Sequence, residues 1–442
     1  MKRSIRARQY DREILRLAVP ALGALAAEPT YILVDTAIVG HLGTPQLAAL
    51  AIAGILLSTG ITLFNFLTYG TTAQVARLHG AGQERAAGRL GAQALWLSVL
   101  LGGTLLVVAV AFASPAVGLM GGEGEAGAMA VTYLRISALG LPFAMISLAG
   151  QGFMRGVGDL RRPLIIVVAA NVANVVLEVL FVYGFGWGIS GSAWGTVIAQ
   201  AGMGTAFVVE LLRAPADLRR PRWATMRPLL KIGGDIAVRT GALLASFALA
   251  SAVVARMGEA SLGAHQISFQ LFFFLALVLD AIAIAGQIMV GRALGAGDAD
   301  GAYAAARRMI GWSVAIGAAF SVTLLALASA LPQVFTDDPA VIERAAAIWP
   351  LLILMQPIGA AVFALDGILI GAGDTRFLKW SMLAAFITFA PLALASLVLG
   401  LGAVGVWTSL NVLMAVRLLT CGARFIGRRW AVTGASREAG KA

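Results

Sequence analysis

Long uncharged apolar stretches recur along the whole chain, and they restrict its fold more than any other feature. Many are about 20 residues long, the length that an α-helix needs to cross the hydrocarbon core of a bilayer. Of the 442 residues, 59% are hydrophobic and only 12% are charged, and the mean hydropathy is +0.86. A water-soluble chain of this length would need far more charged surface. The chain is therefore predicted to lie in a membrane.

The apolar stretches are rich in Ala, Leu, Gly and Val and show no strand-like alternation of polar and apolar residues. This pattern predicts an all-α integral membrane protein and argues against an outer-membrane barrel. Hydropathy and the polar loops between the stretches predict twelve transmembrane helices, at residues 14–39, 46–75, 91–113, 130–154, 163–185, 190–212, 229–256, 263–291, 308–330, 346–370, 379–400 and 403–426.

The composition also removes several classes of function. A single cysteine, Cys421, cannot form an intrachain disulfide, and His41, His79 and His265 are too scattered in sequence to indicate a metal site. The sequence lacks the motifs of intramembrane enzymes, so we expect neither an enzyme nor a cofactor. The net charge of +11 could indicate a nucleic-acid partner, but the basic residues lie in short clusters between apolar stretches. Loops that face anionic lipid have this pattern, so we expect no nucleic acid.

The basic clusters occupy every second loop, which predicts how the chain is oriented in the membrane. With a cytoplasmic amino terminus, the inner segments hold Lys2 to Arg16, Arg77/Arg85/Arg89, Arg155/Arg161/Arg162, Arg213 to Lys231, Arg292/Arg307/Arg308, Arg376/Lys379 and Arg417 to Lys441. The outer loops keep only Arg256 and Arg344. We therefore expect a multi-pass protein of the plasma (inner) membrane with both termini in the cytoplasm.

An internal repeat divides the spans into two sets of six. A shift of 215 residues aligns Arg77 with Arg292 (292 − 77 = 215). The same shift aligns Val75, Gly80, Ala81, Gly82, Pro142, Gly152, Gly156, Gly158, Asp159 and Arg161 with Val290, Gly295, Ala296, Gly297, Pro357, Gly367, Gly371, Gly373, Asp374 and Arg376. Because each half has an even number of spans, we expect two six-helix bundles related by a pseudo-two-fold axis along the membrane normal.

The repeat also predicts domain boundaries. We expect an amino-terminal lobe at residues 1–212, a carboxy-terminal lobe at residues 229–427 and a cytoplasmic tail at residues 428–442. The basic segment at residues 213–228 links the lobes and suits a cytoplasmic hinge. The Gly-Ala-Gly and Arg-Gly-Val-Gly-Asp motifs are interpreted as loop chemistry, because glycine permits tight turns and arginine anchors at the level of the lipid phosphates.

Five acidic residues stand in apolar stretches where they cannot reach the membrane surface: Glu28, Asp35, Glu178, Asp280 and Asp366. Burying a central acid costs about 3 kcal/mol on insertion scales, so such residues mark a wet cavity, a hydrogen-bonded partner or protonation. For Asp35 and Glu178 we favour a functional role over a fixed pair that only joins two helices. Glu28, Asp280 and Asp366 are candidates for the substrate cavity. The last two could equally pair with a neighbouring backbone or with Arg239.

One face of the first predicted helix carries three polar side chains. Glu28, Tyr31 and Asp35 stand at positions i, i+3 and i+7 and therefore line up over two turns. Pro20 and Pro29 interrupt the hydrogen bonding of the same helix, because proline has no N–H donor. We expect the helix to bend at these prolines.

Two later helices carry polar side chains that could meet this face. Asn174 and Glu178 stand one turn apart in the fifth helix, and Thr196 adds a hydroxyl from the sixth. A carboxyl group in a low-dielectric site beside a second carboxyl binds a proton more readily, so Asp35 and Glu178 form a candidate proton-coupling site. A sodium ion is the alternative, because hard cations prefer the oxygen ligands that Asp, Glu, Asn and Thr provide.

Several segments match the pattern of a known transporter family. The first helix contains AVPAL, with Pro20, and LVDTAIVGHLG, with Asp35. Later segments are NVANVVLEVLFVYGFGWGISGSAWGTVIAQ, LGAHQISFQLFFF, LDAIAIAGQIMVGRALGAGD and LDGILIGAGDTRF. Together they resemble the multidrug and toxic compound extrusion (MATE) family, and its DinF-like branch in particular. The resemblance covers nearly the whole chain.

The resemblance implies a role for each matching residue. Asp35 matches the aspartate whose protonation is thought to bend the first helix at the position of Pro20 and to expel substrate. The surrounding hydrogen-bond network is matched by Tyr31, Asn174, Glu178 and Thr196. The family more often has aspartate, one methylene shorter, at the position of Glu178.

From these patterns we expect a proton-coupled secondary antiporter, formed by a single chain in membrane lipid, that exports amphipathic cationic molecules by alternating access. Protonation of Asp35 and Glu178 would favour the bent first helix and release the cargo. The alternatives are sodium coupling, export of organic acids or phenolics by the same fold, and a flippase for lipid or polysaccharide precursors. Flippases of that kind usually carry about two more spans.

Overall fold

The computed structural model describes residues 2–437, with side chains from residue 8 onward. Residue 1 and residues 438–442, which close the predicted tail, lie outside the described residues. Contacts within the chain define two compact units. The amino-terminal unit is Gly23–Gly233, and the carboxy-terminal unit joins the chain up to Leu22 to the chain from Gly234 onward.

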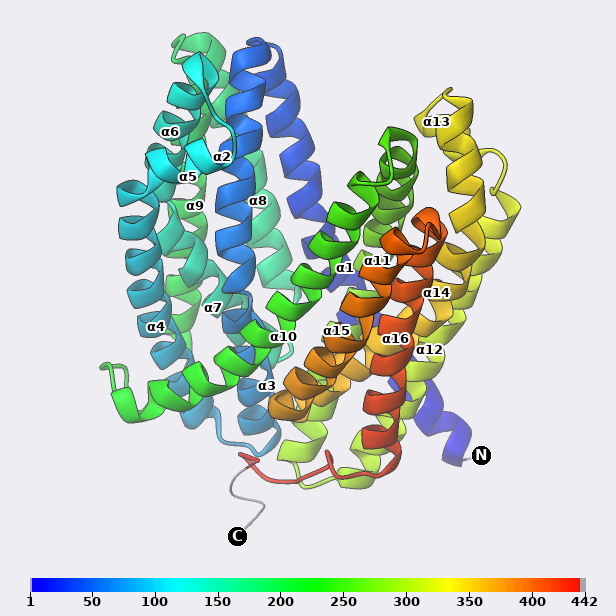
Figure 1. Cartoon of the computed structure of the whole chain (residues 1–442). Helices are drawn as coiled ribbons and strands as arrows, with labels where there is room; N and C mark the ends of the chain where they lie inside the picture. The colour runs from blue at the N-terminus through cyan, green and yellow to red at the C-terminus, as the bar shows by residue number, and fades with distance from the viewer. Residues whose placement is uncertain (1, 438–442) are drawn as a thin grey trace. The chain divides into compact units, whose positions relative to one another are not determined.

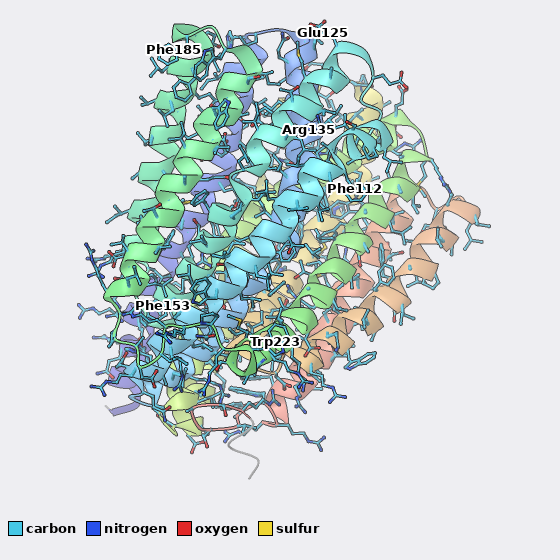
Figure 2. All side chains as sticks on the ribbon, turned by 90° about the vertical axis from the view of Figure 1, so that its left-hand side faces the viewer. Phe112, Glu125, Arg135, Phe153, Phe185 and Trp223 are labelled. Atoms are coloured by element: carbon cyan, nitrogen blue, oxygen red, sulfur yellow. The ribbon has the colours of Figure 1, made fainter. Side chains whose placement is uncertain are left out.

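Helix α1 (Lys2–Gly40) contributes to both units, and so does α10 (Trp223–Ala255). Between them the amino-terminal unit contains α2 (Thr44–Leu63), α3 (Phe66–Gly80), α4 (Glu84–Ala111), α5 (Ala113–Leu119), α6 (Gly124–Ala138), α7 (Leu141–Gly156), α8 (Arg161–Val179), the π-helical turn η1 (Leu180–Gly184) and α9 (Gly188–Arg213). Figure 2 shows Glu125 and Phe185 near one end of this unit and Phe153 and Trp223 toward the other.

Helix α7 is central to the amino-terminal unit, because it packs against α3, α4 and α9. Small residues allow this close packing: a Cβ atom on Gly152 would come within 2.7 Å of the carbonyl oxygen of Thr68. Membrane helices approach each other closely through such small residues, since apolar burial alone does not drive their association in lipid.

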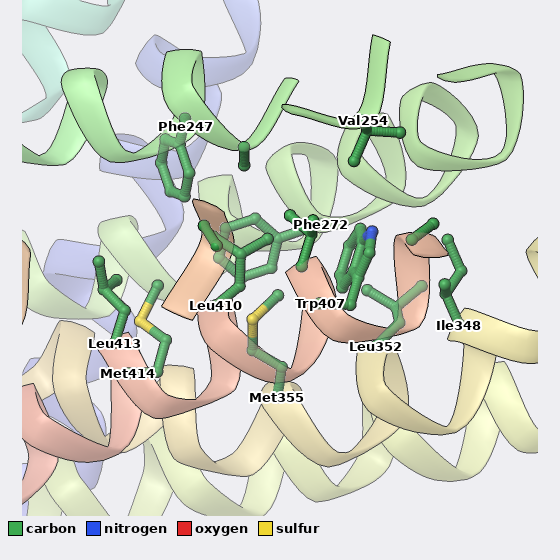
Figure 3. Close-up of a cluster of buried hydrophobic side chains, with 14 of the residues drawn as sticks. Phe247, Val254, Phe272, Ile348, Leu352, Met355, Trp407, Leu410, Leu413 and Met414 are labelled. Atoms are coloured by element: carbon green, nitrogen blue, oxygen red, sulfur yellow. The ribbon is translucent and has the colours of Figure 1, made fainter. Parts of the chain in front are cut away.

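The carboxy-terminal unit contains α11 (Glu259–Gly295), α12 (Ala299–Ala326), α13 (Leu331–Phe335), α14 (Pro339–Gly371), α15 (Thr375–Val398) and α16 (Gly402–Ile426). Helix α14 packs against α11, α12 and α16, and Figure 1 shows α14 and α16 side by side. The apolar core of the carboxy-terminal unit includes Phe272, Leu352, Met355 and Trp407, which Figure 3 shows as one cluster.

The helices confirm the predicted all-α fold and its spans. Within residues 2–437, eleven helical segments are long and apolar enough to cross a membrane, and α6 with α7, bent by 50°, makes twelve when the bent pair is counted as one span. Each overlaps one predicted span. The observed helices are longer at many ends, because polar residues at the membrane surface continue the helix that hydropathy ends: α12 begins at Ala299, nine residues before the predicted 308 (308 − 299 = 9).

The repeated glycines have matching structural roles in the two units. Gly367 stands 215 residues after Gly152, and a Cβ atom on it would lie 2.7 Å from the carbonyl carbon of Ala283. Gly158 and its counterpart Gly373 both have positive φ, at 83° and 69°, where glycine meets no Cβ penalty. The turn role predicted for these glycines therefore agrees with the structure, whereas Arg155 of the Arg-Gly-Val-Gly-Asp motif is only 7% exposed and does not fit the predicted anchor at the lipid phosphates.

The division into units differs from the predicted lobe boundary at the start of the chain. The first part of α1 packs in the carboxy-terminal unit, where Glu13 forms an ion pair with Arg292. Asp11 accepts hydrogen bonds from Arg308 Nε at 2.6 Å and Trp312 Nε1 at 2.8 Å. Acidic residues at the start of α1 thus meet basic residues far away in sequence.

The segment expected as a linker, 213–228, packs against α4 within the amino-terminal unit. Gln93 Nε2 donates to the carbonyl of Arg220 at 2.9 Å, and Trp96 Nε1 donates to the carbonyl of Arg219 at 2.8 Å. Arg89 forms an ion pair with Asp217 at 2.8 Å. The helix α10 begins at Trp223, inside the predicted linker, and continues through Pro228.

Candidate functional site

Four helices of the amino-terminal unit, α1, α6, α8 and α9, bring polar side chains together around Asp35. This residue lies on α1 and is buried, and its Oδ1 accepts a hydrogen bond of 2.9 Å from Ser192 Oγ on α9. Tyr133 of α6 is buried beside the same groups, close enough to interact with Asp35 and Ser192. The acid therefore lies among hydroxyl groups rather than in an apolar contact.

Thr196 connects this group to α1 and α8. Its Oγ1 donates to the carbonyl of Ser192 at 3.1 Å and accepts a hydrogen bond of 3.2 Å from Asn174 Nδ2. The hydroxyl of Tyr31 lies 3.1 Å from the same Oγ1. The structure thus brings together Tyr31, Asn174 and Thr196, as the sequence predicts.

Close packing of α8 on α9 places Asn174 and Glu178 against this group. A Cβ atom on Gly195 would come within 3.2 Å of the backbone nitrogen of Glu178, and one on Gly191 would come within 2.8 Å of the carbonyl carbon of Phe181. The α-helical geometry of α8 ends at Val179, one residue after Glu178, where the π-helical turn η1 begins. Such turns are frequent at functional sites.

Asp35 and Glu178 are close enough to interact electrostatically. Glu178 is 0% exposed, and in the described part of the chain neither of its oxygens has a donor. Two ionised carboxyl groups at this distance repel, whereas one shared proton turns the contact into a hydrogen bond. No basic side chain among the described residues forms an ion pair with either acid.

A cavity of about 180 Å³ lies beside the acids and shares side chains with their network. Glu28 lines it from α1, and its apolar walls include Ile61, Leu148 and Met203. Its polar lining comes from α1, α7, α8 and α9: Glu28, Tyr31, Ser147, Gln151, Asn171, Asn174, Thr196 and Gln200. We call it the amino-unit pocket.

The remaining predicted acids lie in the carboxy-terminal unit. Asp366 is buried on α14, and its Oδ2 accepts from Arg239 of α10 and from Arg417 of α16. Pairing with Arg239 was one of the two alternatives for this acid. Asp280 lies half-buried on α11. Neither acid lines the amino-unit pocket.

The prolines of α1 lie within a continuous helix. The structure has α-helical geometry from Lys2 to Gly40, through both Pro20 and Pro29. The boundary between the two units falls between Leu22 and Gly23, two residues after Pro20. A proline next to this boundary weakens the helix there, because it removes one backbone hydrogen bond.

The sequence analysis did not predict four further residues of the network and the pocket: Tyr133, Asn171, Ser192 and Gln200. One signal could have found two of them: Ser192 and Gln200 stand four residues before and after Thr196, on the same face of α9. No comparable signal points to Tyr133, because its helix, α6, carries no second polar residue of the site.

Comparisons with known proteins agree with this fold. A family model described as MatE matches the chain twice, at residues 20–180 and 236–396. The two matches are related by a shift of 216 residues (236 − 20 = 216), which supports the internal repeat. A crystal structure of a MATE transporter in the bent conformation has a TM-score of 0.85 over 95% of both chains, at 21% sequence identity, and this likeness concerns the fold.

Relatives in sequence cover most of the chain. The chain is 32% identical to Protein DETOXIFICATION 44, chloroplastic, of Arabidopsis thaliana, over 94% of this chain and 82% of that protein. It is 30% identical to Multidrug resistance protein PmpM of Pseudomonas aeruginosa, over 85% and 81%, and 28% identical to DNA damage-inducible protein F of Escherichia coli, over 93% and 91%. These matches confirm the resemblance to the MATE family, whose members are transporters rather than enzymes. The chain therefore belongs to the MatE family of multidrug efflux transporters.

Proposed function

We propose that this protein is a proton-coupled secondary antiporter that exports amphipathic cations by alternating access. The observation that carries the proposal is the buried pair Asp35 and Glu178, which shares a hydrogen-bond network with the amino-unit pocket and has no basic partner in the described part of the chain. Two neighbouring carboxyl groups without a basic partner can exchange a proton with the solvent, whereas a carboxylate that forms an ion pair with arginine stays ionised.

Three residues belong both to the network and to the wall of the pocket: Tyr31, Asn174 and Thr196. When Asp35 is ionised it accepts the hydroxyl proton of Ser192. A protonated carboxyl group can donate instead, so Ser192 and then Thr196 would change partners. The pocket wall changes with them, and the affinity for cargo falls as the proton binds.

The pocket favours a cargo with both apolar and cationic parts. Ile61, Leu148 and Met203 supply apolar contact, and Glu28 supplies negative charge. No basic side chain among the described residues forms an ion pair with Glu28, so a cationic cargo would supply its counter-charge. The position of Pro20 next to the boundary between the units suits a bend of α1 during transport.

The same proposal includes the cellular setting. Basic residues in alternate loops support a plasma-membrane protein with both termini in the cytoplasm. The network and the pocket lie within one unit of one chain, so we propose that a single chain transports. Apart from the coupling ion, the proposed transport cycle needs no cofactor.

Transport in liposomes tests the proposal. The purified chain and its Asp35→Asn variant are reconstituted, and export of a fluorescent cation is followed under an imposed pH gradient or an imposed sodium gradient. We expect the pH gradient to drive export by the native chain, and the variant to fall to the leak of protein-free liposomes. Asp300→Asn, at an acid whose side chain is 90% exposed, is the matched control and should transport normally.

The possible outcomes separate the alternatives. Export driven only by the sodium gradient would make sodium the coupling ion. Export that ignores both gradients, or normal coupled export by Asp35→Asn, would refute the coupling site.

A further inference from the structure

The segment that precedes α10 is held in one conformation by side chains of α4. Gln93 Nε2 donates to the carbonyl of Arg220 at 2.9 Å, and Gln93 Oε1 accepts a hydrogen bond of 2.7 Å from the backbone N–H of Arg222. Trp96 Nε1 donates to the carbonyl of Arg219 at 2.8 Å. The guanidinium group of Arg219 in turn donates to three carbonyls at the end of α9. Arg220 and Arg222 therefore extend from a backbone that is already ordered.

The other basic side chains of this region have no partner inside the protein. Arg220, Arg222, Arg227 and Lys231 are exposed, and within the described residues none of them forms an ion pair. Residues 218–234 contain no Asp or Glu. The positive charge of this surface is therefore not compensated locally, and it suits an anionic ligand.

The first turns of α10 have an apolar and a basic face. Met226 and Leu229 are buried. Trp223, Arg227 and Lys231 stand at positions i, i+4 and i+8, so they share the opposite, exposed face. The side chain of Trp223 is 61% exposed, and Figure 2 shows it toward the same end of the amino-terminal unit as Phe153. Exposed tryptophan beside basic residues is typical of the level of the lipid headgroups.

The length of α10 supports this level. The helix has 33 residues, which extend about 50 Å at 1.5 Å per residue, whereas about 20 residues cross the hydrocarbon core of a bilayer. About a dozen residues are thus left for the headgroup region. They are the first ones, because the basic residues stand at the start of the helix and the apolar residues follow.

We infer that Arg220, Arg222, Trp223, Arg227 and Lys231 form a binding site for the phosphate headgroup of an anionic phospholipid. We call these residues the linker surface, and all of them lie in the amino-terminal unit. Guanidinium groups bind phosphate oxygens through paired N–H bonds. Such a site differs from the general attraction of basic loops to anionic lipid, because its arginines extend from an ordered backbone. The exposed indole and the continuation of α10 as a membrane span favour a lipid over a soluble phosphate.

Lipid binding to the purified full chain in a neutral detergent tests the inference. Phosphatidylglycerol and phosphatidylcholine with the same acyl chains are added separately, and native mass spectrometry measures the Kd of each lipid. Phosphatidylcholine carries its own cation and has no net charge. We expect phosphatidylglycerol to bind at least about tenfold more tightly, because each basic residue near an anionic surface contributes about fivefold in affinity. Glycerol phosphate, which has no acyl chains, should not displace it at constant ionic strength.

Two double variants connect the preference to the linker surface. Arg220→Gln with Arg222→Gln removes two cations of the site and should weaken phosphatidylglycerol more than about tenfold, with little effect on phosphatidylcholine. Arg85→Gln with Arg161→Gln removes the same charge from the same unit, at arginines that are also exposed but lie outside the linker surface. This control should keep the preference.

Each outcome decides the assignment. Equal affinities of the native chain for the two lipids would overturn the site. Equal losses in the two double variants would overturn it as well, because the preference would then follow net charge alone. Displacement by glycerol phosphate would overturn the choice of a lipid over a soluble phosphate. Export and its coupling ion are measured separately in liposomes, so the lipid site and the proposed antiport can fail independently.

Discussion

Replacing Asp366 with asparagine should destabilise the carboxy-terminal unit strongly. The carboxylate accepts from Arg239 and Arg417 through the same oxygen, and asparagine keeps the shape but removes the charge. The side chain of Arg417 is 3% exposed and that of Arg239 is 15% exposed, so Arg417 cannot turn to water. Removing one member of a buried ion pair costs about 3–5 kcal/mol, because the other charge stays buried. We expect a loss of about 3 kcal/mol in the free energy of unfolding.

Two further variants test whether this loss comes from the stranded charge. Arg239→Gln leaves the pair of Asp366 and Arg417 intact and should cost about 2 kcal/mol, the usual contribution of one hydrogen bond to a charged group, which is less than the loss from Asp366→Asn. Asp366→Asn combined with Arg417→Met removes both buried charges and should be more stable than Asp366→Asn alone, since apolar groups often replace a buried pair without loss.

Denaturation in mixed micelles, followed by tryptophan fluorescence, measures the free energy of unfolding of each variant. Asp300→Asn removes one member of an exposed pair with Arg428 and should show no measurable change. A loss below about 1 kcal/mol for Asp366→Asn, typical of exposed pairs, would refute the reasoning. So would a double variant less stable than Asp366→Asn, since the cost would then not arise from an uncompensated cation.

Two more perturbations address the amino-terminal unit. Ser192→Ala removes the donor to Asp35, a contact worth about 1 kcal/mol, and should slow gradient-driven export about fivefold in liposomes. The control Ser190→Ala, on the same helix, should transport normally. Equal export rates for the two variants would contradict the role of Ser192. Gly152→Ala places a methyl group 2.7 Å from the carbonyl oxygen of Thr68 and should cost about 1–3 kcal/mol in micelle denaturation. Gly103→Ala, where a Cβ atom meets nothing within 4 Å, should be neutral or slightly stabilising, and equal losses at both glycines would show that packing is not the cause.

The spans could be predicted because the bilayer fixes their length and polarity. Breaks and bends inside the spans could not be predicted, because they leave the hydropathy unchanged. Examples are the break between α2 and α3 at Phe64 and Asn65 and the bend between α6 and α7. The start of α10 at Trp223 was missed for the opposite reason, because its first turns are polar and basic although they are helical.

The site residues were predictable where helical spacing determines them. Asn174 and Glu178 share a face of α8, and Tyr31 shares one with Asp35 on α1, so periodicity alone groups each pair. The partners across helices depend on tertiary packing. Tyr133 joins the site only because α6 packs against α9, and Asp11 meets Arg308 only because the first part of α1 lies in the carboxy-terminal unit.

The repeat shows how one architecture gives two chemically different units. At the 215-residue shift, the four polar residues Asp35, Asn174, Glu178 and Ser192 correspond to Ala250, Phe389, Ala393 and Trp407 (35 + 215 = 250; 174 + 215 = 389; 178 + 215 = 393; 192 + 215 = 407). All four counterparts belong to the apolar core of the carboxy-terminal unit, and Trp407 lies within the cluster of Figure 3. That unit has apolar packing where the amino-terminal unit has its proposed proton site.

The residues that line the amino-unit pocket also have chemically different counterparts in the carboxy-terminal unit. Ala24 and Gln151 line it, and their counterparts at the shift of 215 are Arg239 and Asp366 (24 + 215 = 239; 151 + 215 = 366). A small and a neutral side chain in one unit are thus replaced by an ion pair in the other. Arg239 and Arg417 both form ion pairs with Asp366, whereas Asp35 and Glu178 form none among the described residues. The acid pair that we propose binds the coupling proton, and the pocket that shares its hydrogen-bond network, therefore lie in the same unit.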